Sequence, residues 1–186
     1  MGQRMFVAIV PPQPIRDELE EFLSFRPQMR WISPEQWHVT LAFMENVPQR
    51  CEDELLERLQ YGFSRKSAFH MQLVGGGCFP DPSRAKVLWV RPVVEGDQLA
   101  ALALTARSAA VKAGVRADGR RFVPHVSVAR LRRPLAAIQW LRILDSFTSS
   151  TWEVDAVELI ASYLKEGPAG RPRYETVGVL PLGEGL

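Results

Sequence analysis

The sequence contains one short phrase twice, HVTLAF at residues 38–43 and HVSVAR at residues 125–130. Each copy holds an imidazole, a β-branched residue, a hydroxyl, an aliphatic residue and an alanine. Successive side chains of a β-strand point to opposite faces, so the imidazole and the hydroxyl share one face and the aliphatic side chains share the other. The aliphatic face can be buried. Each phrase therefore predicts a strand, called a motif strand below, that displays an acid–base group beside a hydroxyl.

The segments around the two phrases follow one order twice: strand, helix, motif strand, helix, strand, with one further strand at the end. Gly75–Gly77 and Pro92 are expected to end the strands before them, and the last helix should bury Leu135, Ile138, Leu141 and Leu144. The predicted strands cover residues 5–10, 38–43, 69–74, 87–90, 123–130, 152–160 and 174–180, and the predicted helices cover residues 15–25, 52–63, 97–113 and 135–147.

This repetition indicates an internal duplication, which builds two similar lobes related by a pseudo-two-fold axis. No linker-like stretch separates the halves. We therefore expect a single bilobal α+β domain over residues 1–186, in which two antiparallel sheets form a central cleft and the helices pack outside. The two motif strands should line that cleft.

Charge is distributed unevenly along the chain. Residues 112–142 hold eight Lys or Arg against Asp118 alone, which makes this stretch +7 and, since the net charge is +2, the remainder −5. A positive field around the second motif strand would attract a polyanion such as nucleic acid. An Arg-rich surface that is merely solvated is about as good an interpretation of charge alone.

Composition also bears on location and cofactors. Cys51 and Cys78 have no Cys or His neighbour at metal-ligand spacing, so free thiols in a reducing compartment are expected. No apolar run reaches membrane-spanning length, and the first six residues do not resemble a secretory signal. We expect a cytoplasmic monomer without a membrane anchor, a metal or a cofactor.

Two of the three histidines, His38 and His125, lie in the repeated phrase. Two imidazoles suit a reaction that needs a base and an acid at neutral pH, because the unperturbed pKa of histidine is about 6.5. Thr40 and Ser127 could donate to the non-bridging oxygens of a phosphate, and a Thr nucleophile is the alternative. His70 has no such phrase around it and should be an exposed strand residue.

Other chemistries lack their motifs. The chain has no HExxH, paired CxxC or GxSxG sequence, which argues against a zinc site and an acyl-transfer elbow. The triple glycine is followed by Cys78 and Phe79 rather than Lys and Ser or Thr, so it predicts a loop and not a phosphate cradle.

The two phrases resemble the His-x-Thr/Ser-x motifs of the two-histidine phosphoesterase superfamily. Within it, the chain is similar to the RNA 2′,3′-cyclic phosphodiesterases, also called 2′-5′ RNA ligases. The likeness extends to residues 5–12, 30–32, 122–130, Ser162 and the C-terminal region of residues 167–175. The sequence departs at Met44-Glu45, where Leu-Gly is usual and a turn could be altered, and at Ser127, where Thr is common.

The resemblance implies metal-independent hydrolysis of an RNA 2′,3′-cyclic phosphate end to a 2′-phosphate, with ligation as the possible reverse. It implies that His38 protonates the departing oxygen and that His125 activates water. The residues alone leave these two roles open, because the halves are nearly equivalent. The expected partner is RNA with cyclic phosphate ends.

Three further residues are candidates for substrate contact. Arg130 lies five positions after His125, so regular alternation places it on the opposite face, and it reaches the cleft only if the strand ends or twists. Phe43 holds the matching position in the first phrase and could pack in the core or stack on a base. Tyr174, with Trp31 and Trp37, could stack on a nucleobase, although core packing is the better interpretation for both tryptophans.

Two alternative functions remain. The same site could act on another substrate: a 2′-5′ oligonucleotide, a cyclic ADP-ribose phosphate or a small cyclic nucleotide. The chain could instead be a non-catalytic protein that binds RNA ends, although neither histidine is replaced.

Overall fold

The computed structural model describes residues 2–183, so residue 1 and residues 184–186 of the predicted domain lie outside the described residues. Its strands are β1 (Gln3–Ile9), β2 (Val39–Val47), β3 (Phe69–Phe79), β4 (Ala85–Val94), β5 (Val126–Leu135), β6 (Trp152–Val154), β7 (Ala156–Tyr163) and β8 (Arg173–Pro181). Its helices are α1 (Gln13–Ser24), α2 (Glu52–Phe63), α3 (Gln98–Lys112) and α4 (Ile138–Asp145), with 3-10 turns η1 (Pro34–Gln36), η2 (Gln49–Cys51) and η3 (Pro168–Gly170).

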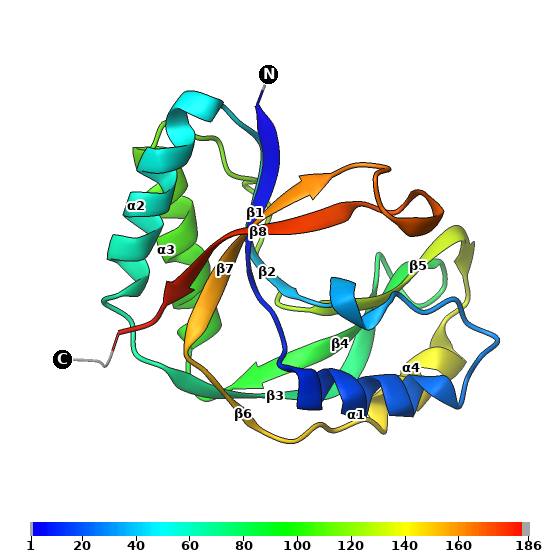
Figure 1. Cartoon of the computed structure of the whole chain (residues 1–186). Coiled ribbons are helices and arrows are strands. Elements are labelled where there is room, and N and C mark those ends of the chain that lie inside the picture. The colour runs from blue at the N-terminus through cyan, green and yellow to red at the C-terminus, as the bar shows by residue number, and fades with distance from the viewer. Residues whose placement is uncertain (1, 184–186) are drawn as a thin grey trace.

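The two halves of the chain exchange strands. The described strands run in the order β6-β3-β4-β5-β2-β1-β7-β8, and every pair is antiparallel (Figure 1). One lobe therefore holds β2, β1, β7 and β8, and the other holds β5, β4, β3 and β6. The predicted α+β class and the two corresponding lobes are confirmed, but each lobe contains strands from both halves of the sequence.

The motif strands β2 and β5 join the lobes through one residue pair, Val39 opposite Val126. This pair merges the two predicted sheets into a single sheet. Beyond it the strands diverge, and each free edge is covered by the segment that precedes the other motif strand. The Ile32 amide donates to the Val128 carbonyl at 2.8 Å, and the Asp118 amide donates to the Phe43 carbonyl at 2.8 Å.

A β-bulge interrupts β2 inside the first phrase. Thr40 lies opposite Ala8 and Ala42 lies opposite Val7, which leaves Leu41 without a partner on β1. Leu41 and Ala42 are consecutive and both are buried. A bulge adds one residue to a strand, so the alternation of side chains is reversed after it.

The same bulge recurs in β5, inside the second phrase. Ser127 lies opposite Trp89 and Ala129 lies opposite Leu88, so Val128 has no partner on β4. Val128 and Ala129 are again both buried. The duplicated phrase therefore encodes a strand with an internal bulge, and not the regular strand that the sequence predicts.

The helices bury apolar stripes against the outer side of the sheet. Helix α2 has the predicted bounds and buries Leu55, Leu59 and Phe63; α2 and α3 pack against each other, and α2 also contacts β8 (Figure 1). Helix α4 differs from its prediction. Leu144 is buried, but 36% of Leu135 and 56% of Ile138 are exposed, because β5 continues to residue 135 and the helix starts three residues later.

Two predicted strand ends are wrong, and one irregularity explains both. Strand β3 continues through the three glycines, and β4 continues past Pro92 to Val94. Between the pairs Leu73–Pro92 and Gly76–Val90, β3 has one residue more than β4. Gly75 has φ +67° there, the left-handed conformation that such a bulge requires, and proline is tolerated in strands next to a bulge. Likewise, β2 runs through Met44 without a turn.

We expect Gly76→Ala to destabilise the fold by about 1–3 kcal/mol, because a new methyl group overfills a packed contact. A Cβ atom at Gly76 would lie 2.5 Å from Leu144 Cβ and 2.9 Å from the Trp89 carbonyl oxygen. Urea denaturation of Gly76→Ala beside Gly119→Ala measures the effect, since a Cβ at Gly119 has no described residue other than its own chain neighbours within 4 Å. Equal unfolding free energies in the two variants would contradict it.

Candidate active site

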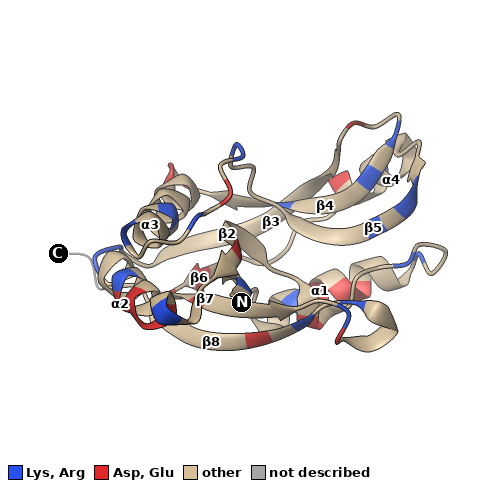
Figure 2. Ribbon diagram, turned by 90° about the horizontal axis from the view of Figure 1, so that it is seen from above, with Lys and Arg blue, Asp and Glu red and all other residues tan. Residues whose placement is uncertain are grey.

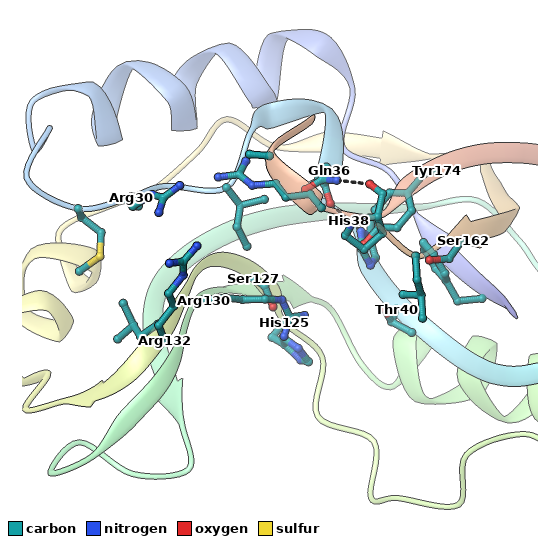
Figure 3. A pocket seen from close by; sticks show the side chains of 18 of the residues that line it. Arg30, Gln36, His38, Thr40, His125, Ser127, Arg130, Arg132, Ser162 and Tyr174 are labelled. Carbon is teal, nitrogen blue, oxygen red and sulfur yellow. Dashed lines mark hydrogen bonds between the residues drawn. The ribbon is translucent and has the colours of Figure 1, made fainter. Parts of the chain in front are cut away.

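A pocket of about 1020 Å³ opens between the two motif strands. His38 and Thr40 of the β2 side and His125 and Ser127 of the β5 side all line it (Figure 3). The bulges lie after these residues, so within each phrase the imidazole and the hydroxyl still share a face. The four residues predicted from the repeated phrase are thus brought together around one space.

Both imidazoles are held in the same way. His38 Nδ1 lies 2.7 Å from the carbonyl oxygen of Gln36, and His125 Nδ1 lies 2.7 Å from the carbonyl oxygen of Val123. A carbonyl oxygen can only accept, so each Nδ1 carries a proton. Each Nε2 is therefore free to accept a proton when the ring is neutral, and to donate one when the ring is charged.

Burial lowers the pKa of both histidines. Loss of solvation lowers the pKa of His38 from 6.5 to about 4; the Gln36 carbonyl opposes this, and the positive charges of Arg130 and His125 lower the pKa further. Loss of solvation is also the main reason why the pKa of His125 falls below 6.5, with Arg130 adding to it. Both rings are therefore neutral at pH 7 in the unliganded protein.

Aromatic side chains support each imidazole on its own side. The His38 ring lies 4.6 Å from the Phe6 ring and 5.6 Å, edge on, from the Tyr174 ring. The His125 ring lies 4.9 Å, edge on, from the Phe79 ring. These contacts leave each ring little freedom to rotate, so each Nε2 keeps a fixed direction.

Arg130 and Phe43 both line the pocket, because the bulges return them to the face of the imidazoles. Regular alternation, which would place Arg130 on the face away from His125, therefore does not hold past the bulge, and Arg130 reaches the pocket by the departure from a regular strand that its candidacy required. Phe43 is half-buried, and the guanidinium carbon of Arg4 lies 4.4 Å from its ring centroid. This cation–π contact places a second guanidinium at the pocket.

Among the other predicted aromatics, only Tyr174 lines the pocket. Burial raises the pKa of its hydroxyl, although Arg130 and Arg4 counteract this, so the hydroxyl stays protonated at neutral pH and can donate. Trp37 is 2% exposed and belongs to the hydrophobic core, and Trp31 is half-buried and packs against that core. Both agree with the prediction that the tryptophans pack in the core. His70 is exposed on β3, also as predicted.

Sequence reasoning missed several residues of this pocket. Gln36 accepts from His38 through its backbone carbonyl, while its side chain donates to the Pro172 carbonyl at 2.8 Å and so ties the segment before β8 to the first histidine. Ser162, opposite Tyr174 in the sheet, and Trp140 of α4 also line the pocket. No motif or periodicity marks Gln36 or Trp140, and Ser162 entered only through the family resemblance, without a place in the site. Their side chains meet only because β7, β8 and α4 pack around the motif strands.

The pocket is strongly basic. Its lining includes six arginines and no carboxylate: Arg4, Arg30, Arg130, Arg132, Arg133 and Arg171. Figure 2 shows Lys and Arg bands on β5 near the end of the molecule that carries α4. None of the six forms an ion pair within residues 2–183. The field around the site therefore favours an anionic ligand.

Two features of the described residues concern metals and membranes. Within residues 2–183, no three His, Cys, Asp or Glu side chains are grouped so that they could hold a metal ion. No helix in the same range has both the length and the apolarity needed to cross a membrane.

A family model described as the 2′-5′ RNA ligase superfamily matches residues 11–166. The chain belongs to this superfamily. The family predicted from the two phrases is thereby confirmed, and the matched range contains both phrases.

Curated relatives of this 2′-5′ RNA ligase superfamily member are named RNA 2′,3′-cyclic phosphodiesterase. The Thermus thermophilus protein is 31% identical over 176 residues, covering 89% of this chain and 85% of that protein. The Escherichia coli protein is 29% identical over 154 residues, covering 78% of this chain and 85% of that protein. The Geobacillus stearothermophilus protein is 29% identical over 161 residues, or 86% of this chain but 49% of its own length, so this chain spans about half of it.

Solved structures show the same fold. The apo form of Escherichia coli LigT superposes with a TM-score of 0.78 at 26% identity and covers 98% of both chains. LigT complexed with 3′-AMP gives a TM-score of 0.77 at 26% identity, with 98% of this chain and 99% of that chain covered.

Proposed function

We propose that the protein hydrolyses RNA 2′,3′-cyclic phosphate ends to 2′-phosphates without a metal ion, and that it can run the reverse reaction as 2′-5′ ligation. The observation that carries this proposal is the convergence of His38 and His125, each with a free Nε2, on one arginine-rich pocket. Curated relatives named RNA 2′,3′-cyclic phosphodiesterase, and the binding of 3′-AMP by LigT, support the choice of an RNA end.

In the proposed reaction, a water oxygen attacks phosphorus while His125 Nε2 accepts a proton from that water. The bond between phosphorus and the 3′ oxygen breaks, and His38 Nε2 donates its proton to the departing oxygen. The products are a 3′ hydroxyl and a 2′-phosphate. The next cycle begins after a proton has passed from His125 to His38 through solvent.

The surroundings of the two rings support this division of roles. The hydrogen bond of His125 to Val123 is exposed, whereas that of His38 to Gln36 is partly buried. Water therefore reaches His125 more readily. His38, with the lower pKa, is the stronger acid once protonated, and the negative charge of a bound phosphate raises its pKa toward neutrality.

The hydroxyls and the guanidinium complete the site. Thr40 and Ser127 are proposed to donate to the two non-bridging oxygens of the phosphate, on which negative charge accumulates during attack. Arg130 lies close enough to lower the pKa of both histidines. In the complex, the same charge would stabilise the anionic phosphate.

The test is incubation of the purified protein, in chelator, with an RNA that carries a 2′,3′-cyclic phosphate end. Mass spectrometry and sensitivity to phosphatase identify the product phosphate and its position. We expect a 2′-phosphate. Turnover only of 2′-5′ oligonucleotides, of cyclic ADP-ribose phosphate or of small cyclic nucleotides would favour the substrate alternative. RNA binding without turnover would favour the non-catalytic one.

We expect kcat/KM to be highest below pH 6.5 and to fall about tenfold per pH unit between pH 7 and 8. The active free enzyme needs one protonated and one neutral imidazole, and both pKa values lie below 6.5, so raising the pH removes the required proton. Bound phosphate raises both pKa values, so the alkaline limb of kcat should lie at higher pH. A kcat/KM that is constant from pH 5 to 8 would contradict this.

A further inference from the structure

The pocket extends beyond the four motif residues toward the far end of β5. Arg30, Arg130 and Arg132 lie at the end of the pocket opposite Ser162 and Tyr174 (Figure 3). Its volume of about 1020 Å³ is at the upper limit for a single small ligand, for which about 300–1,000 Å³ is typical. The pocket can therefore hold more than the terminal nucleotide.

A second irregularity of β5 builds this extension. Val87 of β4 lies opposite Arg130, and Ala85 lies opposite Leu135. Four residues of β5, 131–134, therefore stand opposite the single residue Lys86. This excess moves Arg132 and Arg133 out of the regular ladder, and both line the pocket. Bulges of this kind re-aim side chains next to functional sites.

The arginines of the extension are not neutralised by the protein. Arg30, Arg132 and Arg133 are exposed, and no carboxylate pairs with them within residues 2–183. Elsewhere, exposed arginines such as Arg84 and Arg173 do form ion pairs. An unpaired arginine cluster in a groove is suited to the phosphates of a nucleic acid backbone.

An aromatic surface accompanies these charges. Trp140 of α4 is half-buried and lines the same pocket, and its ring is fixed by an edge-on contact with Trp31 at 5.7 Å. Proteins that bind single-stranded nucleic acid combine cationic grooves with aromatic rings on which bases stack. Trp140 supplies such a ring beside the arginines.

We propose that Arg30, Arg132, Arg133 and Trp140 form a distal subsite for the single-stranded RNA immediately 5′ of the terminal cyclic phosphate. The arginines contact backbone phosphates and Trp140 stacks on a base. The protein would then select the ends of RNA chains over free cyclic nucleotides. The choice of a cyclic-phosphate RNA as the substrate rests on the proposed function. The distal subsite as an RNA-binding surface does not depend on that function.

The test compares kcat/KM for an RNA pentamer with a 2′,3′-cyclic end against 2′,3′-cyclic AMP at about 50 mM salt. We expect a preference for the pentamer of about tenfold or more. The double variant Arg132→Glu/Arg133→Glu should reduce this preference at least tenfold, mainly through KM. Trp140→Ala should reduce it in the same direction, and circular dichroism checks that each variant is folded.

The matched control is Arg116→Glu/Arg121→Glu. Both residues are exposed in the same basic stretch and lie outside the pocket, so this variant has the same change in net charge. We expect its preference for the pentamer to stay within about twofold of the parent, because screening weakens distant charges. Equal reductions in both double variants, or no preference in the parent protein, would overturn the subsite.

Failure of the proposed function has a different signature. If the parent protein hydrolyses neither substrate, that function is wrong, and the subsite is tested by fluorescence anisotropy with a labelled RNA pentamer ending in a 3′-phosphate. Weaker binding by the Arg132→Glu/Arg133→Glu variant than by the control would still support it. The salt slope of log Kd should also fall by about 0.7 for each phosphate that the variant no longer neutralises. Equal Kd values would overturn it.

Discussion

Replacing either His38 or His125 with alanine should lower turnover of a cyclic-phosphate RNA end by roughly 10²–10⁴. Both rings line the same pocket, and because each Nδ1 is held by a backbone carbonyl, Nε2 is the nitrogen left for proton transfer. Alanine can neither accept nor donate that proton. Because the two rings are proposed to act in one step, the turnover of the double variant should be only slightly lower than that of the less active single variant. Single-turnover rates with excess enzyme measure the chemical step directly.

Two controls separate chemistry from folding. His70→Ala removes an exposed histidine on β3 outside the pocket and should retain full activity. His38→Gln keeps a side-chain donor near the Gln36 carbonyl but cannot titrate near pH 7, so it should be as inactive as the alanine variant while its unfolding free energy stays close to the parent value. Full activity in a folded His38 or His125 variant would refute the proposed mechanism.

The second large decrease in activity is expected when either of the two paired hydroxyls is removed. We expect Thr40→Ala and Ser127→Ala each to lower kcat by about 10², the lower end of the range for removal of one donor to a developing negative charge. The effect should be in kcat more than in KM, because the donated hydrogen bonds strengthen as charge accumulates on the phosphate oxygens.

Exchanging the hydroxyls tests this role. Thr40→Ser and Ser127→Thr keep an oxygen at the same position and should retain activity within about tenfold of the parent. A Thr nucleophile predicts another pattern, in which Thr40→Ala abolishes turnover while Ser127→Ala has little effect. Unequal effects of that kind would favour covalent catalysis over a symmetric contact with the phosphate.

The sequence predicts which candidate residues share the pocket better than it predicts the path of the strands. Imidazole and hydroxyl lie two residues apart within each phrase, before the bulge, so alternation places them correctly. Arg130 lies after the bulge, and alternation fails there by one position. Whether Val128 pairs with β4 or forms the extra residue of a bulge depends on the register of β4 against β5. That register is set by tertiary contacts, so the sequence of β5 alone does not determine it.

The glycines and the distal arginines illustrate the same limit. Gly75–Gly77 predict a break from local propensity, but the strand continues, because Gly75 forms a bulge and Gly76 leaves room for Leu144 and Trp89. The uneven charge of residues 112–142 indicated a cationic surface. The charge pattern alone does not show that Arg132 and Arg133, among the basic residues of this stretch, line the pocket. Arg30 lies outside the stretch and comes close to them only when the chain folds.

The exchange of strands between the lobes has a consequence for synthesis on the ribosome. Strand β1 is synthesised long before β7, one of its two neighbours, which lies about 150 residues later in the chain. Residues Met5–Ala8 of β1 pair with Glu158–Ala161 of β7. Contacts so distant in sequence form late. A nascent chain that already contains His38 therefore keeps an open sheet edge until β7 has been synthesised. Ribosome-bound chains stopped before residue 156 should accordingly be cleaved by protease within β1 and β2, whereas the released protein should resist.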